Sequence, residues 1–261
     1  MLGKTNATHR IDFKPPQIVN YIMLYDYGDE CIDVTGGWEN TATYVSGQPS
    51  SYSGAYTENE NNIYVYGSGS TKQPCAGTSN MVDVTGYIKA YINWNYQRGN
   101  TTYGWNRFGC GSVKNEPMYT GNTYGIYSNQ NNVLLSYSGL SSFDIPDGTT
   151  EAYFQMNIQS NSSSGWAENY MYHCFLVRAD DWQTLASLAG ISASSIDDIL
   201  TNSSTLLSNE EAVKFMIYNC TGDFMVSAIQ NNTFLTALNN SQYKTKIYAN
   251  KHWSKFLSMI V

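Results

Sequence analysis

Three histidines are the first candidates for metal or acid–base chemistry in this sequence: His9, His173 and His252. The chain contains no HExxH or HxH motif, and no two histidines stand at the spacing of metal ligands. His9 precedes the pair Pro15-Pro16, whereas His173 lies in a strand-like segment and His252 in a helix-like one. The sequence therefore predicts neither a metal centre nor a bound cofactor.

Carboxylates and serines are the next candidates, because either could serve a hydrolase. A glycosidase needs two carboxyl groups that face each other across the scissile bond, and Asp26, Asp29, Glu30 and Asp33 form one acidic cluster. The simpler interpretation of that cluster is a solvated loop. The stretches GCGS (109–112) and YSGLSS (137–142) lack the GxSxG pattern of a nucleophile elbow. We therefore expect no enzymatic activity, with a glycan hydrolase left as an alternative.

Three tryptophans could bind a ligand without catalysis. Trp38, Trp105 and Trp166 stand in the Gly/Asn/Ser-rich stretches TGGWEN, TYGWNRFG and SSGWAEN, which favour loops. An aromatic ring in such a loop can stack on a sugar ring while neighbouring Asn and Asp side chains reach its hydroxyls. The same residues could instead pack as lids over the ends of a sandwich, or lie in interfaces with other subunits.

The composition narrows the class of protein. Only 13% of the 261 residues are charged, whereas 14% are aromatic, including 22 Tyr and 6 Trp, and the formal net charge is −7. Neutral polar and Tyr-rich surfaces are typical of extracellular β-proteins, lectins and virion proteins. Nucleic-acid binding requires clustered cations and is not expected. The five cysteines follow no CxxC spacing, so we expect most to be reduced and buried: Cys31, Cys75, Cys110, Cys174 and Cys220.

Between about residues 18 and 178 the chain has the pattern of short strands. IVNYIMLY, NIYVYG, YIKAYINWNY, NVLLSY, AYFQMNIQ and YMYHCFLV are rich in β-branched and aromatic residues and are separated by turn residues. In YIKAYINWNY, period-2 alternation predicts one buried face, made of Ile88, Ala90, Ile92 and Trp94. The other face of that strand carries Tyr87, Lys89, Tyr91 and Asn93. In AYFQMNIQ the predicted buried residues are Ala152, Phe154, Met156 and Ile158. Many strands without intervening helices indicate an antiparallel β-sandwich of jelly-roll type.

Near Arg178 the pattern changes to short helices. ADDWQTLASLAG predicts a helix capped by Asp180 or Asp181 and ended by Gly190. In SNEEAVKFMIYN, Ser208 and Glu211 have the spacing of a capping box. We therefore divide the chain into an extended N-terminal arm (1–17), a β-sandwich domain (18–178) and a small helical domain (179–261).

The last helix-like segment, KHWSKFLSMIV, carries one apolar stripe. Its members follow the spacing i, i+3, i+4 and i+7: Trp253, Phe256, Leu257 and Ile260. The stripe could close the chain's own helical domain, or it could anchor the protein to a neighbouring copy in a homo-oligomer, for which a trimer is the most plausible form.

The tetrapeptide DVTG occurs twice, in CIDVTGGW (31–38) and MVDVTGYI (81–88). Thr-Gly after a β-branched residue favours a tight turn at a strand end. A cation bound near Asp33 or Asp83 is the less favoured interpretation, because a single Asp supplies too few oxygen ligands. The repeat is best explained as a structural corner used twice.

LYDYGDECIDVTGGW and MVDVTGYIKAYINW resemble the opening of β-sandwich modules found in tail, fibre and other virion-associated proteins of bacteriophages. The segment from Phe224 to Ile260 is similar to the short helical repeats that follow such modules. The resemblance covers about two thirds of the chain and contains no diagnostic residue signature. It implies a virion structural or adhesive protein with a sandwich like a carbohydrate-binding module, and it brings no catalytic residues.

The function expected from these observations is a non-enzymatic bacteriophage surface protein, which decorates the capsid as a head fibre or belongs to the tail and attaches to host-surface glycans. Its partners would be other virion proteins and copies of itself. The opening MLGKTNATHR lacks the apolar segment of a signal peptide, so we expect synthesis in the bacterial cytoplasm and assembly into the virion. A free-standing carbohydrate-binding module or lectin is the alternative.

Overall fold

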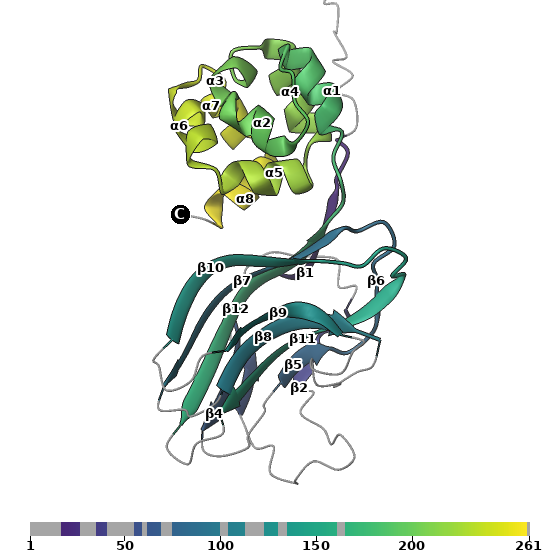
Figure 1. Ribbon diagram of the computed structural model, residues 1–261, viewed down its shortest axis with the longest axis vertical. Helices are drawn as coiled ribbons and strands as arrows, with labels where there is room; N and C mark the ends of the chain where they lie inside the picture. The colour runs from purple at the N-terminus through teal and green to yellow at the C-terminus, as the bar shows by residue number, and fades with distance from the viewer. Residues whose placement is uncertain are drawn as a thin grey trace, which may run out of the picture.

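The computed structural model describes residues 17–26, 35–40, 55–58, 62–68, 75–99, 104–112, 123–129, 135–160 and 165–259. Two antiparallel β-sheets stack into a sandwich, and a group of short helices lies at one end of it (Figure 1). This confirms the predicted fold class. Among the described residues, no helix is both long and apolar enough to cross a membrane. Residues 1–16 of the predicted arm lie outside the described part.

The first sheet, sheet A, has the strand order β10-β7-β12-β4-β3, and β1 also pairs with β12. Its strands are β1 (Tyr21–Asp26), β3 (Ala55–Glu58), β4 (Ile63–Ser68), β7 (Lys89–Gly99), β10 (Leu135–Asp144) and β12 (Trp166–Val177). Strand β12 pairs with β4 over its first half and with β1 over its second half. The sheet therefore joins strands that are up to about 150 residues apart in the chain, as a jelly-roll type of sandwich requires.

The second sheet, sheet B, has the order β2-β5-β11-β8-β9, and β6 also pairs with β11. Its strands are β2 (Trp38–Asn40), β5 (Cys75–Thr78), β6 (Val82–Asp83), β8 (Gly104–Gly111), β9 (Thr123–Asn129) and β11 (Glu151–Ser160). Apolar side chains from both sheets meet in one core between them.

Period-2 alternation predicted one strand better than another. In β11 all four expected residues are buried: Ala152, Phe154, Met156 and Ile158. In β7 the prediction holds for Ala90, Ile92 and Trp94, but Ile88 precedes the strand and is 37% exposed. Tyr91, which was assigned to the exposed face, is buried against the helices. That part of the prediction was wrong because β7 is covered on both faces over part of its length.

Both DVTG segments turn the chain. Gly36 and Gly86 have φ values of +67° and +77°, in the left-handed region that favours glycine. In the second copy the Asp83 carboxylate accepts a hydrogen bond from the Thr85 backbone N–H at 2.9 Å. This confirms the structural corner; Asp33 of the first copy lies outside the described residues.

Eight short helices follow β12 in the described part of the chain. They are α1 (Trp182–Ala189), α2 (Ile196–Thr201), α3 (Ser203–Leu206), α4 (Glu210–Asn219), α5 (Asp223–Ile229), α6 (Asn232–Asn240), α7 (Lys244–Tyr248) and α8 (Lys251–Ser258). As predicted, Asp181 caps α1 and Gly190 ends it with φ +69°. The cap of α4 is Asn209 and not Ser208, because the Asn209 side chain accepts the hydrogen bond from the Ala212 N–H.

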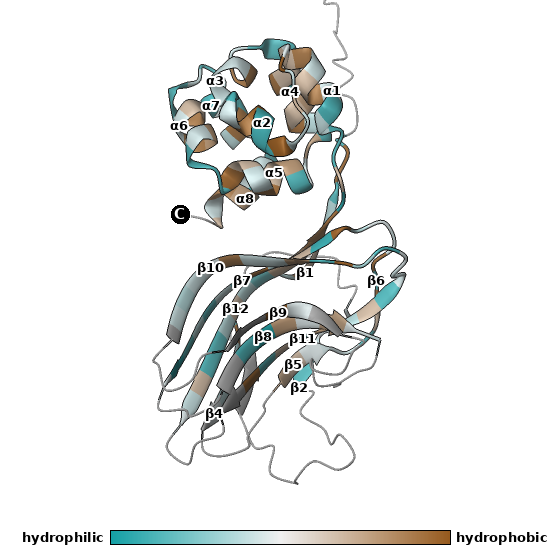
Figure 2. Ribbon diagram, in the orientation of Figure 1, coloured by the Kyte–Doolittle hydropathy of each residue, from teal (hydrophilic) through white to brown (hydrophobic). Residues whose placement is uncertain are grey.

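The helices form a module with its own apolar core, and this module also packs on sheet A. Helices such as α1, α2 and α5 carry hydrophobic and hydrophilic segments side by side, as amphipathic helices do (Figure 2). The apolar core of the module continues onto the outer face of sheet A through Met23, Tyr91, Phe175 and Val177. We call these four residues the covered half of that face. The change from strands to helices falls between Val177 and Trp182, near the boundary placed at residue 178.

Candidate functional site

The outer face of sheet A continues beyond the helical module as a group of aromatic residues around one carboxylate. In β4, Ile63 and Val65 point into the sandwich core, so Tyr64 and Tyr66 point outward. The same alternation in β12 turns three further side chains outward. The resulting group, which we call the tyrosine face, consists of Tyr64, Tyr66, Trp166, Glu168 and Tyr170.

Strand register brings these residues together. Tyr66 lies opposite Glu168 and Tyr64 lies opposite Tyr170 in the β4–β12 pair, and Trp166 is two residues before Glu168 on the same face. The rings of Tyr64 and Tyr66 are 6.3 Å apart at an interplanar angle of 20°, and those of Tyr64 and Tyr170 are 4.6 Å apart at 31°. All five side chains are half-buried. They therefore form a fixed aromatic surface with access to solvent.

Glu168 holds two of these tyrosines in place. Its Oε2 accepts hydrogen bonds from the hydroxyls of Tyr64 at 3.1 Å and Tyr170 at 3.4 Å. Burial, followed by the negative charge of Glu168, raises the pKa of Tyr64 and that of Tyr170. Both phenols are thus protonated donors at neutral pH.

Small polar side chains flank the aromatic residues. In the neighbouring strand β7, Asn95 lies opposite Tyr170 and Gln97 lies opposite Glu168. In β10, Ser138 and Ser136 lie opposite Asn95 and Gln97 in turn. Across four strands the surface therefore passes from aromatic rings, through a carboxylate, to amides and hydroxyls.

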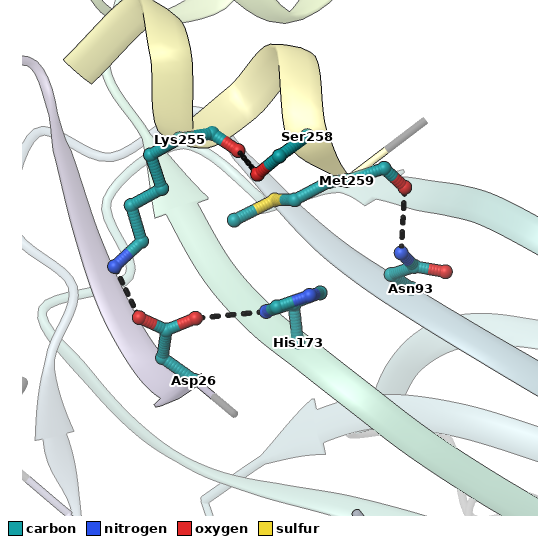
Figure 3. Close-up of polar contacts among 6 residues, drawn as sticks. All are labelled: Asp26, Asn93, His173, Lys255, Ser258 and Met259. Atoms are coloured by element: carbon teal, nitrogen blue, oxygen red, sulfur yellow. Dashed lines mark hydrogen bonds and ion pairs between the residues drawn. The ribbon is translucent and has the colours of Figure 1, made fainter. Parts of the chain in front are cut away.

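One end of the tyrosine face is bounded by the junction with helix α8 (Figure 3). Asp26 of β1 accepts from His173 Nδ1 at 2.8 Å and forms an ion pair with Lys255 of α8. In the same row of the sheet, the Asn93 amide donates to the backbone carbonyl of Met259 at 3.0 Å. The register of β12 shifts between Met171 and His173, which turns His173 toward Asp26. The junction fixes the module at the edge of the face.

The electrostatics of this junction stabilise the charged form of Asp26. Burial alone would raise the pKa of Asp26, but hydrogen bonds and charges from His173 and Lys255 outweigh burial and lower it. A second hydrogen bond joins Tyr21 of β1 to His252 of α8 at 2.7 Å. Both histidines that the structure describes thus connect strands or helices at this junction, and His9 lies outside the described residues. Of the acidic cluster, Asp29, Glu30 and Asp33 also lie outside them.

The structure corrects the predicted location of the three tryptophans. Each lies in a strand and not in a loop: Trp38 opens β2, Trp105 belongs to β8 and Trp166 opens β12. Trp38 is 7% exposed, and its indole N–H donates to the Leu24 carbonyl at 2.9 Å, so its ring is a core element without a free face. The side chain of Trp105 lies outside the described residues. Trp166 is the one of the three that belongs to the tyrosine face.

The apolar stripe of the last helix is buried within its own chain. Trp253 and Phe256 are fully buried and Leu257 is 5% exposed. Trp253 packs against Phe224 and Phe234, with ring centroids 6.5 and 5.9 Å apart. These three aromatic side chains pack together within the helical module, as expected if the stripe closes the chain's own helical domain. Ile260 lies outside the described residues.

Sequence reasoning missed the tyrosines, although a signal was present. NIYVYG was assigned to a strand, and alternation within it already places Tyr64 and Tyr66 on one face. WAENYMY does the same for Trp166, Glu168 and Tyr170. What the sequence could not supply is the pairing of these two strands, which are about 100 residues apart.

No protein-family model matches this sequence, and no curated protein matches it either. Solved structures with similar folds include the following three. A family 11 carbohydrate-binding module from Clostridium thermocellum is 14% identical, covers 62% of this chain and 98% of its own, and has a TM-score of 0.32. A legume lectin-like domain from Entamoeba histolytica is 11% identical, covers 56% of this chain and 92% of its own, and has a TM-score of 0.37. The enzymatically active domain of tailspike protein 4 from bacteriophage CBA120 is 13% identical, covers 44% of this chain and 15% of its own, and has a TM-score of 0.27. The fold thus resembles carbohydrate-binding modules and lectins. At these scores the similarity is loose, and no role is inferred from it.

Proposed function

We propose that this protein binds glycans through the tyrosine face without modifying them. The observation that carries the proposal is the pair of nearly parallel rings of Tyr64 and Tyr66 beside the carboxylate of Glu168. The apolar face of a sugar ring packs against aromatic rings, and its hydroxyls require donors and acceptors at the edges of that contact. Glu168 would accept from a sugar hydroxyl, and Asn95 and Gln97 would donate and accept.

A binding role fits Glu168 better than a catalytic one. Its Oε2 already accepts from two tyrosine hydroxyls, so the carboxylate is oriented by the face itself. An acid or base in glycoside hydrolysis needs a second carboxyl group facing it across the bond. Incubation of the protein with a retained glycan should therefore release no new reducing ends, and release above the level of a heat-inactivated sample would contradict this part of the proposal.

The main test is affinity electrophoresis in gels that contain soluble polysaccharides of different backbones, followed by calorimetry with oligomers of any retaining glycan. Tyr66→Ala should weaken binding by roughly fivefold or more, because it removes an aromatic contact of about 1 kcal/mol or above. Tyr248→Ala is the matched control, since Tyr248 is 41% exposed on the distant helix α7. Equal retention of both variants would contradict the assignment of the tyrosine face.

We further propose that the glycan-binding sandwich is displayed on a bacteriophage particle, on the capsid or tail, with other virion proteins and copies of itself as partners. The resemblance of the DVTG-containing segments to virion modules supports this location. Mass spectrometry of purified particles tests it, and light scattering of the isolated protein tests the homo-oligomer. Absence of the chain from intact particles would leave the second candidate, a free-standing carbohydrate-binding protein.

A further inference from the structure

The helical module contains a cavity, open to solvent, that the tyrosine face does not explain. It has a volume of about 700 Å³ and lies between the end of α3 and the exposed side of α6. Its floor includes Leu207 and Ala237. Its polar lining consists of Ser204, Ser208, Asn232, Thr233, Thr236, Asn240, Ser241 and Gln242. This volume is within the range of sites that hold small ligands, and no charged side chain lines it.

The residues of α6 are unusual for a solvent-exposed helix. Five of its nine residues are Asn or Thr, which are weak helix formers. Helix α4 differs, because its exposed side carries charged residues that favour helix formation. Lys214 forms ion pairs with Glu210 at 3.1 Å and with Glu211 at 2.8 Å. Exposed positions filled against local propensity are typical of functional surfaces. The weak helix formers along α6 are therefore best explained by a need for their amide and hydroxyl groups in the cavity.

The cavity is held in shape while part of its lining stays available. The Ser241 hydroxyl donates to the Leu207 carbonyl at 3.1 Å and accepts from the Tyr243 N–H, which fixes the turn after α6 against the end of α3. The Asn240 amide donates to the Thr236 carbonyl. Amide and hydroxyl groups of the other lining residues both donate and accept hydrogen bonds.

From the volume, the neutral lining and the composition of α6 we infer that this cavity, the α3–α6 site, binds a neutral, hydroxyl-rich ligand, namely a short uncharged glycan segment. Ligand hydroxyls would exchange hydrogen bonds with the Asn, Gln, Ser and Thr side chains, while Leu207 and Ala237 contact its C–H groups. An anionic or cationic ligand would gain no countercharge from this lining. The site is separate from the tyrosine face and does not depend on it.

The test is titration of the isotope-labelled full chain by NMR with cellotetraose, maltotetraose, chitotetraose, the anionic tetragalacturonate and acetyl-tetraalanine amide. We expect at least one neutral saccharide to shift the backbone amides of Ser204, Thr233 and Thr236. Thr236→Arg should abolish these shifts or weaken them at least about tenfold, because a long cation then occupies the cavity. Thr184→Arg on the exposed side of α1 is the matched control and should leave them unchanged.

Failure of this inference is distinguishable from failure of the proposed function. Shifts at the α3–α6 site that persist in Tyr66→Ala support the inference whether or not the tyrosine face binds. The inference is overturned if no neutral saccharide shifts these amides, if tetragalacturonate or the peptide shifts them more strongly, or if Thr236→Arg and Thr184→Arg behave alike while both retain the wild-type melting temperature.

Discussion

The outer face of sheet A has two halves that differ in what covers them. In the covered half, Met23, Phe175 and Val177 lie beneath the helical module and are buried. In the tyrosine face, Tyr64, Tyr66 and Glu168 remain half-exposed. Both halves include residues of β12 and follow the same alternation within that strand, so backbone geometry does not separate them. The difference is chemical, because side chains with polar tips can stay in water while purely apolar ones require a cover.

The boundary between the halves is the row that contains Asn93 and His173. Here the contacts to α8 change from aromatic packing, with Phe175 and Phe256 rings 4.9 Å apart, to hydrogen bonds and an ion pair. A polar boundary is expected where a packed interface ends and solvent begins. The comparison therefore predicts that substitutions in the covered half change stability, whereas substitutions in the tyrosine face change binding.

The largest expected effect is that of Phe175→Ala. Phe175 is fully buried and contacts Tyr91 and Phe256, with ring centroids 5.1 and 4.9 Å apart. Its truncation should lower the free energy of unfolding by about 3–5 kcal/mol, since it leaves a cavity beneath the module. Urea unfolding followed by circular dichroism measures this. A loss below about 1 kcal/mol would mean that the module and the sheet do not share a packed core.

A smaller loss is expected when the polar boundary is broken. Asp26→Asn removes the negative charge that pairs with Lys255 and His173. The free energy of unfolding should fall by about 2–3 kcal/mol. This is less than for a fully buried pair, because Lys255 and His173 remain partly accessible to solvent. The control is Asp144→Asn, because the exposed pair Lys89–Asp144 should contribute less than about 1 kcal/mol. Equal effects of the two substitutions in thermal unfolding would contradict this account.

The pH dependence of stability should separate Asp26 from a second carboxylate at the base of the module. Burial, followed by the charge of Asp223, raises the pKa of Asp180 to about 7, whereas the pKa of Asp26 is lowered. The folded state then keeps a proton on Asp180 that the unfolded chain releases near pH 4, so stability should fall as the pH rises from about 4 to about 7. The contribution of Asp26 is present above pH 4 and is lost below it.

Melting temperatures across this pH range test the assignment. Asp180 Oδ2 accepts from the backbone N–H groups of Gly222 and Phe224, and its Oδ1 accepts from the Asn20 amide. Asp180→Asn keeps a side chain of the same size without an ionisable proton, so its stability should vary less between pH 4 and 7 than that of the wild type. An unchanged slope in the variant would show that another group titrates there.

The same two halves show how far sequence reasoning reaches. The alternation in AYFQMNIQ gave the core residues of β11, because the core face of that strand is apolar and its other face carries polar side chains. Two of those polar side chains, Gln155 and Asn157, are buried as well, which the alternation did not predict. In β7 the alternation was correct for the core face but assigned Tyr91 to solvent, because nothing within the strand reports that helices 90 or more residues away will cover it. Local periodicity therefore predicts which face of a strand a residue lies on, but not whether another part of the chain packs on that face.

For the candidate site, the aromatic residue types indicated ligand-binding side chains better than the predicted loops did. The tryptophans were chosen because Gly, Asn and Ser surround them, yet strand ends carry the same residues, and Trp38 proved to be a core side chain. Tyr64, Tyr66 and Glu168 acquire meaning only when β4 pairs with β12. Long-range strand pairing depends on the whole sandwich, so it is not available from either strand alone.

The smallest expected effect tests the comparison most directly, through two tyrosine hydroxyls in different halves. Tyr64→Phe keeps the ring beside Tyr66 and removes one hydrogen bond to Glu168, which retains the bond from Tyr170. Stability should fall by about 0.5–1 kcal/mol at most, because water reaches this half-exposed position, whereas glycan affinity should fall several-fold because Glu168 is held less firmly. Tyr91→Phe makes the same change in the covered half, where Tyr91 is 5% exposed and lies opposite Ser142 of β10. It should change unfolding by a similar or larger amount and leave affinity unaltered. If calorimetry finds the same loss of affinity in both variants, the tyrosine hydroxyls act through overall stability, and the division of the sheet face into a covered half and a binding half is wrong.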